Sequence, residues 1–167
     1  ILGLLSAIGP FSIDMYLPGF PAIAKDLQTS VDAVSYTLAS FFVGVCIGQL
    51  ISGPLLDRFG RKRPLYIGMG LYILASVGCA VSTSVEVLIV FRLFQALGGC
   101  VTMVAPRAII RDLFPVEDSA KIFSMMILIL GVSPILAPTV GSFLIEGFGW
   151  QSVFLVLGAI SLVVLLS

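Results

Sequence analysis

Long apolar stretches alternate with short polar breaks along the whole chain. Each stretch holds about 20 mostly apolar residues, the length that an α-helix needs to cross the hydrocarbon core of a membrane. Within lipid, such a segment has to satisfy its own backbone hydrogen bonds, and a helix does so. The pattern therefore predicts an all-α membrane protein, a bundle of six transmembrane helices at roughly 1–23, 33–55, 65–84, 86–107, 121–144 and 150–167.

The composition is that of a chain whose main solvent is lipid. Apolar residues make up 59% of the sequence and charged residues 11%, whereas soluble domains are about one quarter charged. Nine basic side chains balance nine acidic ones and histidine is absent. The chain therefore has no basic footprint for nucleic acid, and it lacks the commonest metal ligand and general base. We expect no enzyme activity, no nucleic-acid partner and no cofactor.

Lysine and arginine predict the orientation of the helices. The second break, 57–64, contains four basic residues, and the fourth, 111–119, lies among three, whereas the other breaks contain one or none. The positive-inside rule places the two basic breaks in the cytoplasm. Six spans then return both ends of the sequence to the cytoplasmic side. Because the chain starts at Ile1 and stops inside an apolar run at Ser167, we expect a fragment with both ends cut.

One short pattern occurs twice. Leu55–Gly60 and Leu144–Gly149 both read apolar-apolar-acid-x-Phe-Gly, at an offset of 89 residues. The first copy is predicted inside and the second outside, so a three-helix unit would recur upside down, as in many secondary transporters. The alternative is two similar helix ends that both stop at glycine, which is a common way to end a helix.

An acidic residue, Asp14, lies in the first apolar stretch, and Pro18 and Pro21 follow it. A charge in hydrocarbon costs about 3 kcal/mol or more, so it needs a reason. The prolines should kink or end the helix and free backbone groups beside a cavity. Because desolvation favours the protonated form of a carboxyl group, Asp14 is a candidate for proton uptake and release, or for attracting a cationic substrate. The alternative is a carboxylate at the water boundary near a helix end.

A second charge, Arg92, lies in the fourth apolar stretch. Gln95 at i+3 and Gly99 at i+7 share its helical face. Counted from the outer ends of their spans at about 1.5 Å per residue, Arg92 and Asp14 lie at similar depth. An ion pair or a shared water network between them is therefore geometrically possible, and such a pair would serve either transport or structure alone.

The second break reads Gly53-Pro54-Leu55-Leu56-Asp57-Arg58-Phe59-Gly60-Arg61-Lys62-Arg63. Physically, Asp57 at a helix end can accept hydrogen bonds from the N-terminal amides of another helix, and the basic residues can pair with acids on a moving neighbour. The segment resembles the signature G-x-L-x-D-R-x-G-R-[KR] of the major facilitator superfamily, and every fixed position matches. The resemblance implies a cytoplasmic gating motif that closes against a helix of a second half, and its residues would be Gly53, Asp57, Arg58, Gly60, Arg61, Lys62 and Arg63.

Three further segments narrow the resemblance. Asp14–Ile23 is similar to the first-helix motif of bacterial drug:proton antiporters, and in particular of the bicyclomycin and chloramphenicol resistance (Bcr/CflA) group. Arg92–Gly99 resembles the family motif R-x-x-Q-G-x-G, with alanine in place of the first glycine. Ala137–Ser142 resembles the antiporter motif G-P-x-x-G-G, with two of its glycines replaced.

This resemblance implies the N-terminal half of a twelve-helix, proton-coupled multidrug exporter in the bacterial inner membrane, of the kind that confers antibiotic resistance. Asp14 would bind the proton or a cationic drug, Arg92 with Gln95 would tune its charge, and Pro138 with Gly141 would bend the fifth helix and block leakage. The expected partners are a drug-like small molecule, protons, the lipid bilayer and a missing C-terminal six-helix half. No GxxxxGK[ST] loop for ATP occurs, so a proton gradient is the expected energy source.

Aromatic and sulfur-containing side chains such as Tyr16, Tyr36 and Met103 would suit an apolar, adaptable drug site, and they are equally ordinary as packing residues. Two other functions stay open, a transporter of a polar metabolite such as a sugar or an amino acid, and a membrane scaffold without transport. The scaffold is less favoured because Asp14, Arg92 and the basic loop would then be costly without a use.

Overall fold

The computed structural model describes residues 2–166, with side chains described for 3–115 and 119–166. No strand occurs in this part of the chain, and the predicted all-α class is confirmed. The elements are α1 (Leu2–Asp14), the short 3₁₀ helix η1 (Leu17–Gly19), α2 (Phe20–Asp26), α3 (Val31–Phe59), α4 (Lys62–Ala80), α5 (Val85–Leu113), α6 (Val116–Phe148) and α7 (Gln151–Leu166).

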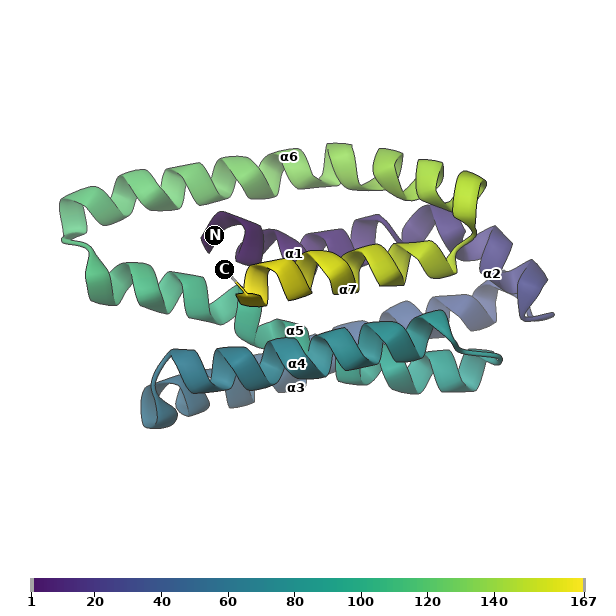
Figure 1. The fold of residues 1–167 in the computed structure, drawn as a ribbon, viewed down its shortest axis with the longest axis horizontal. Coiled ribbons are helices and arrows are strands. Elements are labelled where there is room, and N and C mark those ends of the chain that lie inside the picture. The colour runs from purple at the N-terminus through teal and green to yellow at the C-terminus, as the bar shows by residue number, and fades with distance from the viewer. Residues whose placement is uncertain (1, 167) are drawn as a thin grey trace.

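The helices run along a common axis and form an elongated bundle (Figure 1). Among the described residues, four helices are long and apolar enough to cross a membrane. They are α3, α4, α5 and the part of α6 from Ser119 to Phe148. The predicted spans 1–23 and 150–167 fall on the interrupted segment α1–η1–α2 and on α7, which is apolar but has only 16 residues.

The polar breaks are shorter than the sequence pattern indicated. The break expected at 111–119 is reduced to Phe114 and Pro115, because α5 continues to Leu113 and α6 begins at Val116. The break expected at 146–149 shrinks in the same way, since α6 continues to Phe148. Polar side chains at the end of a span do not end the helix, because a helix that leaves the hydrocarbon stays hydrogen-bonded within itself.

The first span is interrupted where its prolines predict. Pro18 lacks the N–H that would bond the Asp14 carbonyl four residues earlier, and α1 ends at Asp14. A 3₁₀ turn follows, and the helix resumes at Phe20. A Cβ at Gly141 of α6 would overlap the carbonyl oxygen of Met15. The glycine therefore lets α6 pack directly on the interruption.

The inverted repeat predicted from the sequence is visible in the packing. α3 packs on α5, and α6 packs on the first span; α4 contacts both α5 and α7. In the repeat, the first span corresponds to α5, α3 to α6 and α4 to α7. The pair of α3 and α5 then corresponds to the pair of α6 and the first span, as an internal two-fold axis requires. Both copies of the repeated pattern end a long helix at a glycine of positive φ, 78° at Gly60 and 84° at Gly149.

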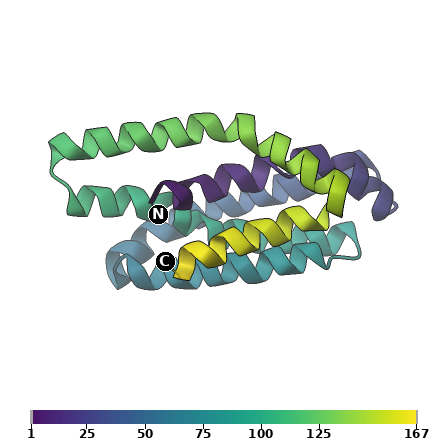
Figure 2. The ribbon, with the colours of Figure 1, turned by 45° about the horizontal axis from the view of Figure 1, so that its top comes forward.

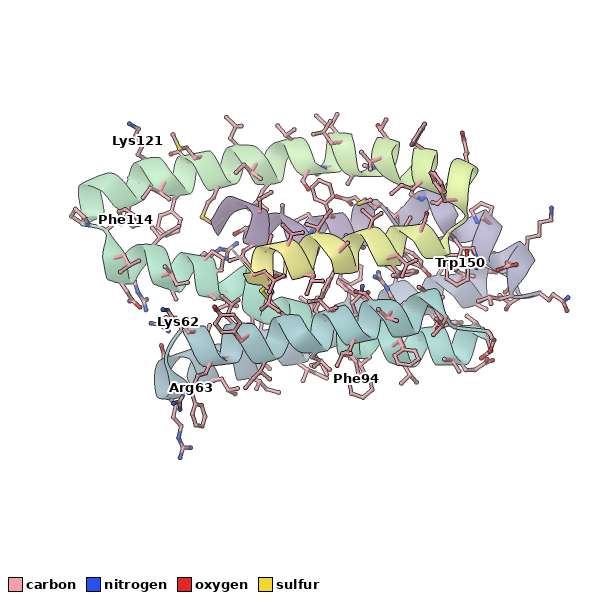
Figure 3. The ribbon with its side chains drawn as sticks, in the orientation of Figure 1. Lys62, Arg63, Phe94, Phe114, Lys121 and Trp150 are labelled. Carbon is pink, nitrogen blue, oxygen red and sulfur yellow. The ribbon has the colours of Figure 1, made fainter. Side chains whose placement is uncertain are left out.

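The two copies lie at opposite ends of the bundle. We call the end that carries the α3–α4 and α5–α6 connections the basic end, because Lys62, Arg63 and Lys121 extend from it (Figure 3). Trp150 lies at the opposite end (Figure 3). The N and C labels lie close together, nearer the basic end, in Figures 1 and 2. In both views α6 forms one edge of the bundle, and it is the least buried of the four long apolar helices.

Candidate functional site

The centre of the bundle holds a fully buried arginine. Arg92, in the first third of α5, has no exposed surface. Its Nη1 donates to the Gln95 side-chain oxygen at 2.8 Å and to the Ser12 carbonyl of α1 at 3.1 Å. The structure therefore brings together Arg92 and Gln95, the two residues that the sequence pattern assigned to one helical face.

Three aromatic rings surround the Arg92 guanidinium group. Its central carbon lies 4.2 Å from the ring centroid of Phe41 in α3, 4.5 Å from that of Tyr16 and 5.7 Å from that of Phe154 in α7. Aromatic faces attract a cation, most strongly where water is excluded. Within the described side chains no carboxylate lies within 4.0 Å of Arg92. Its Nε and Nη2 groups are buried without a hydrogen-bond partner there.

A buried network of small polar groups extends from this arginine. Gln95 Nε2 donates to the Ser76 hydroxyl of α4 at 2.8 Å, and the Ser12 and Tyr72 hydroxyls lie 2.6 Å apart. The network joins α1, α4 and α5 across the bundle. Sequence reasoning did not select Ser12, Ser76 or Tyr72. The available signal was the spacing of Tyr72 and Ser76, which are one helical turn apart in an otherwise apolar span.

Asp14 lies near this site without pairing with Arg92. It is half-buried at the C-terminal end of α1, and the described residues provide it with no ion pair. The Arg92 contact to α1 goes to the carbonyl of Ser12 instead.

The other candidate site residues are distributed over the bundle. Tyr16 belongs to the aromatic cage around Arg92, and its hydroxyl lies 2.6 Å from that of Thr37. Met103 faces α1, because a Cβ at Gly9 would lie 2.7 Å from its methyl carbon. Tyr36 is 66% exposed on α3 and therefore lies outside the buried site.

The gating-motif segment forms an ion-pair cluster at the basic end. Arg61 Nη1 lies 2.8 Å from a carboxylate oxygen of Asp57, and Arg61 Nε lies 2.8 Å from one of Asp112 near the end of α5. The hydrogen bond to Asp112 and, to a smaller extent, the one to Asp57 raise the pKa of Arg61. We call Asp57, Arg61 and Asp112 the arginine clasp. Within the described part of the chain Asp57 thus bonds an arginine, and its predicted bonds to the amides of a further helix stay a prediction.

Sequence reasoning missed Asp112, because it lies in a segment that was interpreted as a loop. Helical continuation to Leu113 carries its carboxylate to the end of α3, where Arg61 lies. A cavity of about 570 Å³ opens beside the clasp between α3, α5 and α6. Its wall carries two further cations, Arg107 and Arg111, beside apolar groups such as Phe123.

A second cluster closes the opposite end. Trp150 Nε1 donates to a carboxylate oxygen of Asp26 at 2.9 Å, and Gln151 Nε2 donates to the same oxygen at 3.2 Å. We call these three residues the tryptophan clasp. The Trp150 ring also packs edge-on against Phe154, with 6.1 Å between centroids. It thereby connects this end of the bundle with the cage around Arg92.

These features occur in a chain with clear relatives. The family model of the Major Facilitator Superfamily matches residues 2–167. The chain belongs to this superfamily. Membership indicates a multi-pass membrane transporter rather than an enzyme, and it places the gating-motif segment and the inverted repeat in a transporter fold.

Curated relatives within the superfamily match almost the whole chain. An uncharacterized MFS-type transporter of Bacillus subtilis, YdgK, is 42% identical over 168 residues, which cover 99% of this chain and 42% of the relative. A bicyclomycin resistance protein homolog of Haemophilus influenzae is 37% identical over 96% of this chain and 40% of its own length. A chloramphenicol resistance protein of Pseudomonas aeruginosa is 36% identical over 93% of this chain and 36% of its own length.

The fold is also found among solved structures. A D-xylose-proton symporter superposes with a TM-score of 0.84 at 17% sequence identity, covering 99% of this chain and 45% of the symporter. This likeness confirms the superfamily fold. The chain spans about two-fifths of the length of the curated relatives that it matches.

Proposed function

We propose that the chain is the N-terminal half of a proton-coupled multidrug exporter that exchanges drug for H⁺ by alternating access. The observation that carries the proposal is Arg92, a fully buried cation with two unpartnered N–H groups and no carboxylate within 4.0 Å among the described side chains. Burying such a charge costs stability. Its bonds to Ser12 and Gln95 offset only part of this cost, since two N–H groups stay unpartnered, and a transporter can use the charge.

The names of the relatives support drug export as the activity. Two of them are designated as proteins of resistance to bicyclomycin and to chloramphenicol. The coverage of about two-fifths of their length supports a second half, which would complete a twelve-helix transporter. Small drug-like molecules, protons and the bilayer are the partners of this proposal, with the proton gradient as the energy source.

In the proposed mechanism Asp14 is the proton site. The carboxyl group lies at the interruption of the first span, where rearrangement of the free backbone groups can open it to either side of the membrane. A proton taken up from outside neutralises Asp14, weakens its hold on a cationic drug and allows the drug to leave. Release of that proton to the inside restores the charge. Arg92 and Gln95, which contact α1 through Ser12, adjust the charge balance of this site.

The two gating elements act on this cycle from either side. The arginine clasp would hold the basic end closed in one state and break in the other, since an exposed ion pair is easily exchanged for water. Pro138 and Gly141 shape α6 where it packs on the interruption beside Asp14, which would keep that seam tight against leakage. The positive-inside rule supports a cytoplasmic basic end with both chain ends on that side, in a bacterial inner membrane.

The decisive experiment is Asp14→Asn in the full-length transporter, reconstituted in proteoliposomes. Loss of the titratable group should abolish proton release on drug binding and remove drug resistance in cells, whereas drug binding itself should remain measurable. Asp32→Asn is the matched control, because Asp32 is an exposed carboxylate in the first turn of α3. If Asp14→Asn retains both proton release and resistance, Asp14 is not the coupling site.

A second candidate is the transport of a polar metabolite, which is favoured by the buried hydroxyl and amide network of Ser12, Tyr72 and Gln95. Such groups bind sugars as readily as they stabilise helices. Counterflow in proteoliposomes separates the two candidates. A fluorescent apolar drug should exchange across the membrane if the protein is a drug exporter, and exchange of a sugar or an amino acid alone would favour the second candidate.

A further inference from the structure

An apolar groove runs along the surface of the bundle between α3 and α4, with α5 at its floor. Its volume is about 420 Å³, and its lining is almost free of polar atoms. Ile51 and Leu55 form one wall, Ile67 and Leu71 the other, and Val101 contributes to the floor. Ile67 is 73% exposed and Ile51 is 50% exposed, so the walls open outward along helices that have the length of membrane spans.

Glycines explain why α4 and α5 approach each other closely at the floor of the groove. A Cβ at Gly68 of α4 would lie 2.9 Å from the carbonyl oxygen of Gly98 in α5. The two helices therefore touch through their backbones, as small residues allow in membrane bundles. No large side chain from either glycine position enters the space above this contact, which leaves the groove open between the flanking apolar side chains.

One end of the groove is basic. Arg63, in the first turn of α4, is part of its lining, and it lies at the basic end of the bundle with Lys62 (Figure 3). Arg61 is engaged by two carboxylates, but Arg58, Lys62 and Arg63 form no ion pair within the described side chains. Of these three cations only Arg63 lines the groove, whereas the Arg58 guanidinium lies 5.5 Å from the ring centroid of Phe59.

We propose that this groove binds one anionic phospholipid, with an acyl chain along the apolar walls and the phosphate on Arg63. The walls match hydrocarbon and offer almost nothing to a polar ligand. A guanidinium group binds phosphate through two parallel hydrogen bonds, and basic pockets between membrane helices are suited to acidic headgroups. A cationic headgroup such as choline would lie beside the Arg63 guanidinium and is therefore disfavoured.

The test is binding of single lipids to the full-length transporter, measured by native mass spectrometry with phosphatidylglycerol and phosphatidylcholine of equal chain length. Wild-type protein should prefer phosphatidylglycerol, and Arg63→Gln should lower that preference about fivefold. Leu71→Trp should fill the groove and weaken the binding of both lipids. Size-exclusion profiles and unfolding temperatures verify that each variant is folded.

Arg58→Gln is the matched control, because it removes the same charge at the same end of the bundle, in the last turn of α3, from a residue that does not itself line the groove. It should leave the preference nearly unchanged. An equal loss in Arg58→Gln and Arg63→Gln would mean diffuse attraction to the basic end and would overturn the site. Equal binding of the two lipids by wild-type protein would also overturn the proposed site. So would a lack of lipid binding, which is the result expected if the rest of the transporter covers the groove.

Discussion

The two ends of the bundle are closed by clasps that share one plan and differ in chemistry. At each end, the residue after the glycine that terminates a long helix reaches a carboxylate near the end of a repeat-related span. Arg61 follows Gly60 and bonds Asp112 of α5, whereas Trp150 follows Gly149 and bonds Asp26 at the end of the first span. The internal repeat therefore preserves the position of the contact and changes the donor.

The difference in chemistry gives the two clasps different strengths. In the arginine clasp both carboxylates are well exposed, with side chains 70% and 42% accessible for Asp57 and Asp112, and exposed ion pairs contribute little to stability. Trp150 is buried and packs on Phe154, which in turn lies against Arg92. The opposite end is thus part of the core, whereas separating the exposed ion pairs of the basic end should cost less.

The largest effect is expected from removing the tryptophan clasp. Trp150→Ala deletes a buried aromatic ring and its hydrogen bond, which should lower the free energy of unfolding by about 3–5 kcal/mol. Trp150→Phe keeps most of the ring and loses only the hydrogen bond, for about 1 kcal/mol. Unfolding of the full-length protein in mixed micelles measures both. If Trp150→Ala is no more harmful than Arg61→Ala, the proposed contrast between the two ends is wrong.

An intermediate effect is expected from the two glycines that precede the clasps. Gly60 and Gly149 combine positive φ with ψ of 172° and 164°, a conformation that is almost restricted to glycine, so alanine should cost about 1–3 kcal/mol at either position. Gly149→Ala should cost slightly more, because its Cβ would displace the Gln151 side chain, which bonds Asp26 in the tryptophan clasp, whereas the space at Gly60 is open.

The control for this pair is Gly131→Ala in α6. Gly131 has helical backbone and nothing within 4 Å of the added Cβ, so alanine there should leave stability unchanged or raise it by about 0.5–1 kcal/mol. Thermal unfolding in the same detergent compares the three variants. A larger loss at Gly60 than at Gly149 would contradict the assignment of the stronger clasp to the opposite end.

Local patterns in the sequence predicted much of this architecture. The apolar stretches, the prolines of the first span and the repeated Phe-Gly ending are all periodic or local signals, and the structure has helices, an interruption and two positive-φ glycines where these signals lie. The expected position of Arg92 beside Gln95 follows in the same way, since residues three apart share a helical face.

The partners of these residues were not predictable in this way. Asp112 is 51 residues from Arg61, and Asp26 is 124 residues from Trp150. The pairing depends on how the helices pack, which no local pattern encodes. Phe41 and Phe154 were missed for a related reason, because in a chain with 12 phenylalanines nothing in the sequence distinguishes the two that face a buried cation from those that face lipid.

The smallest effect on stability is expected from the arginine clasp itself. Asp112→Asn removes one of the two carboxylates on Arg61 and leaves Asp57 in place, so the unfolding temperature should barely change. The transport rate should respond more, because in the proposed mechanism the clasp breaks in each cycle. Wild-type transport should accelerate with added salt, which screens exposed charges over about 8–10 Å at 0.1–0.15 M, and the variant should be fast already at low salt.

Asp32→Asn controls for loss of an exposed carboxylate outside the clasp. A drop in unfolding temperature as large as that of Trp150→Ala would make the basic end a structural anchor like its counterpart, and the bundle would then have no end that opens at low cost.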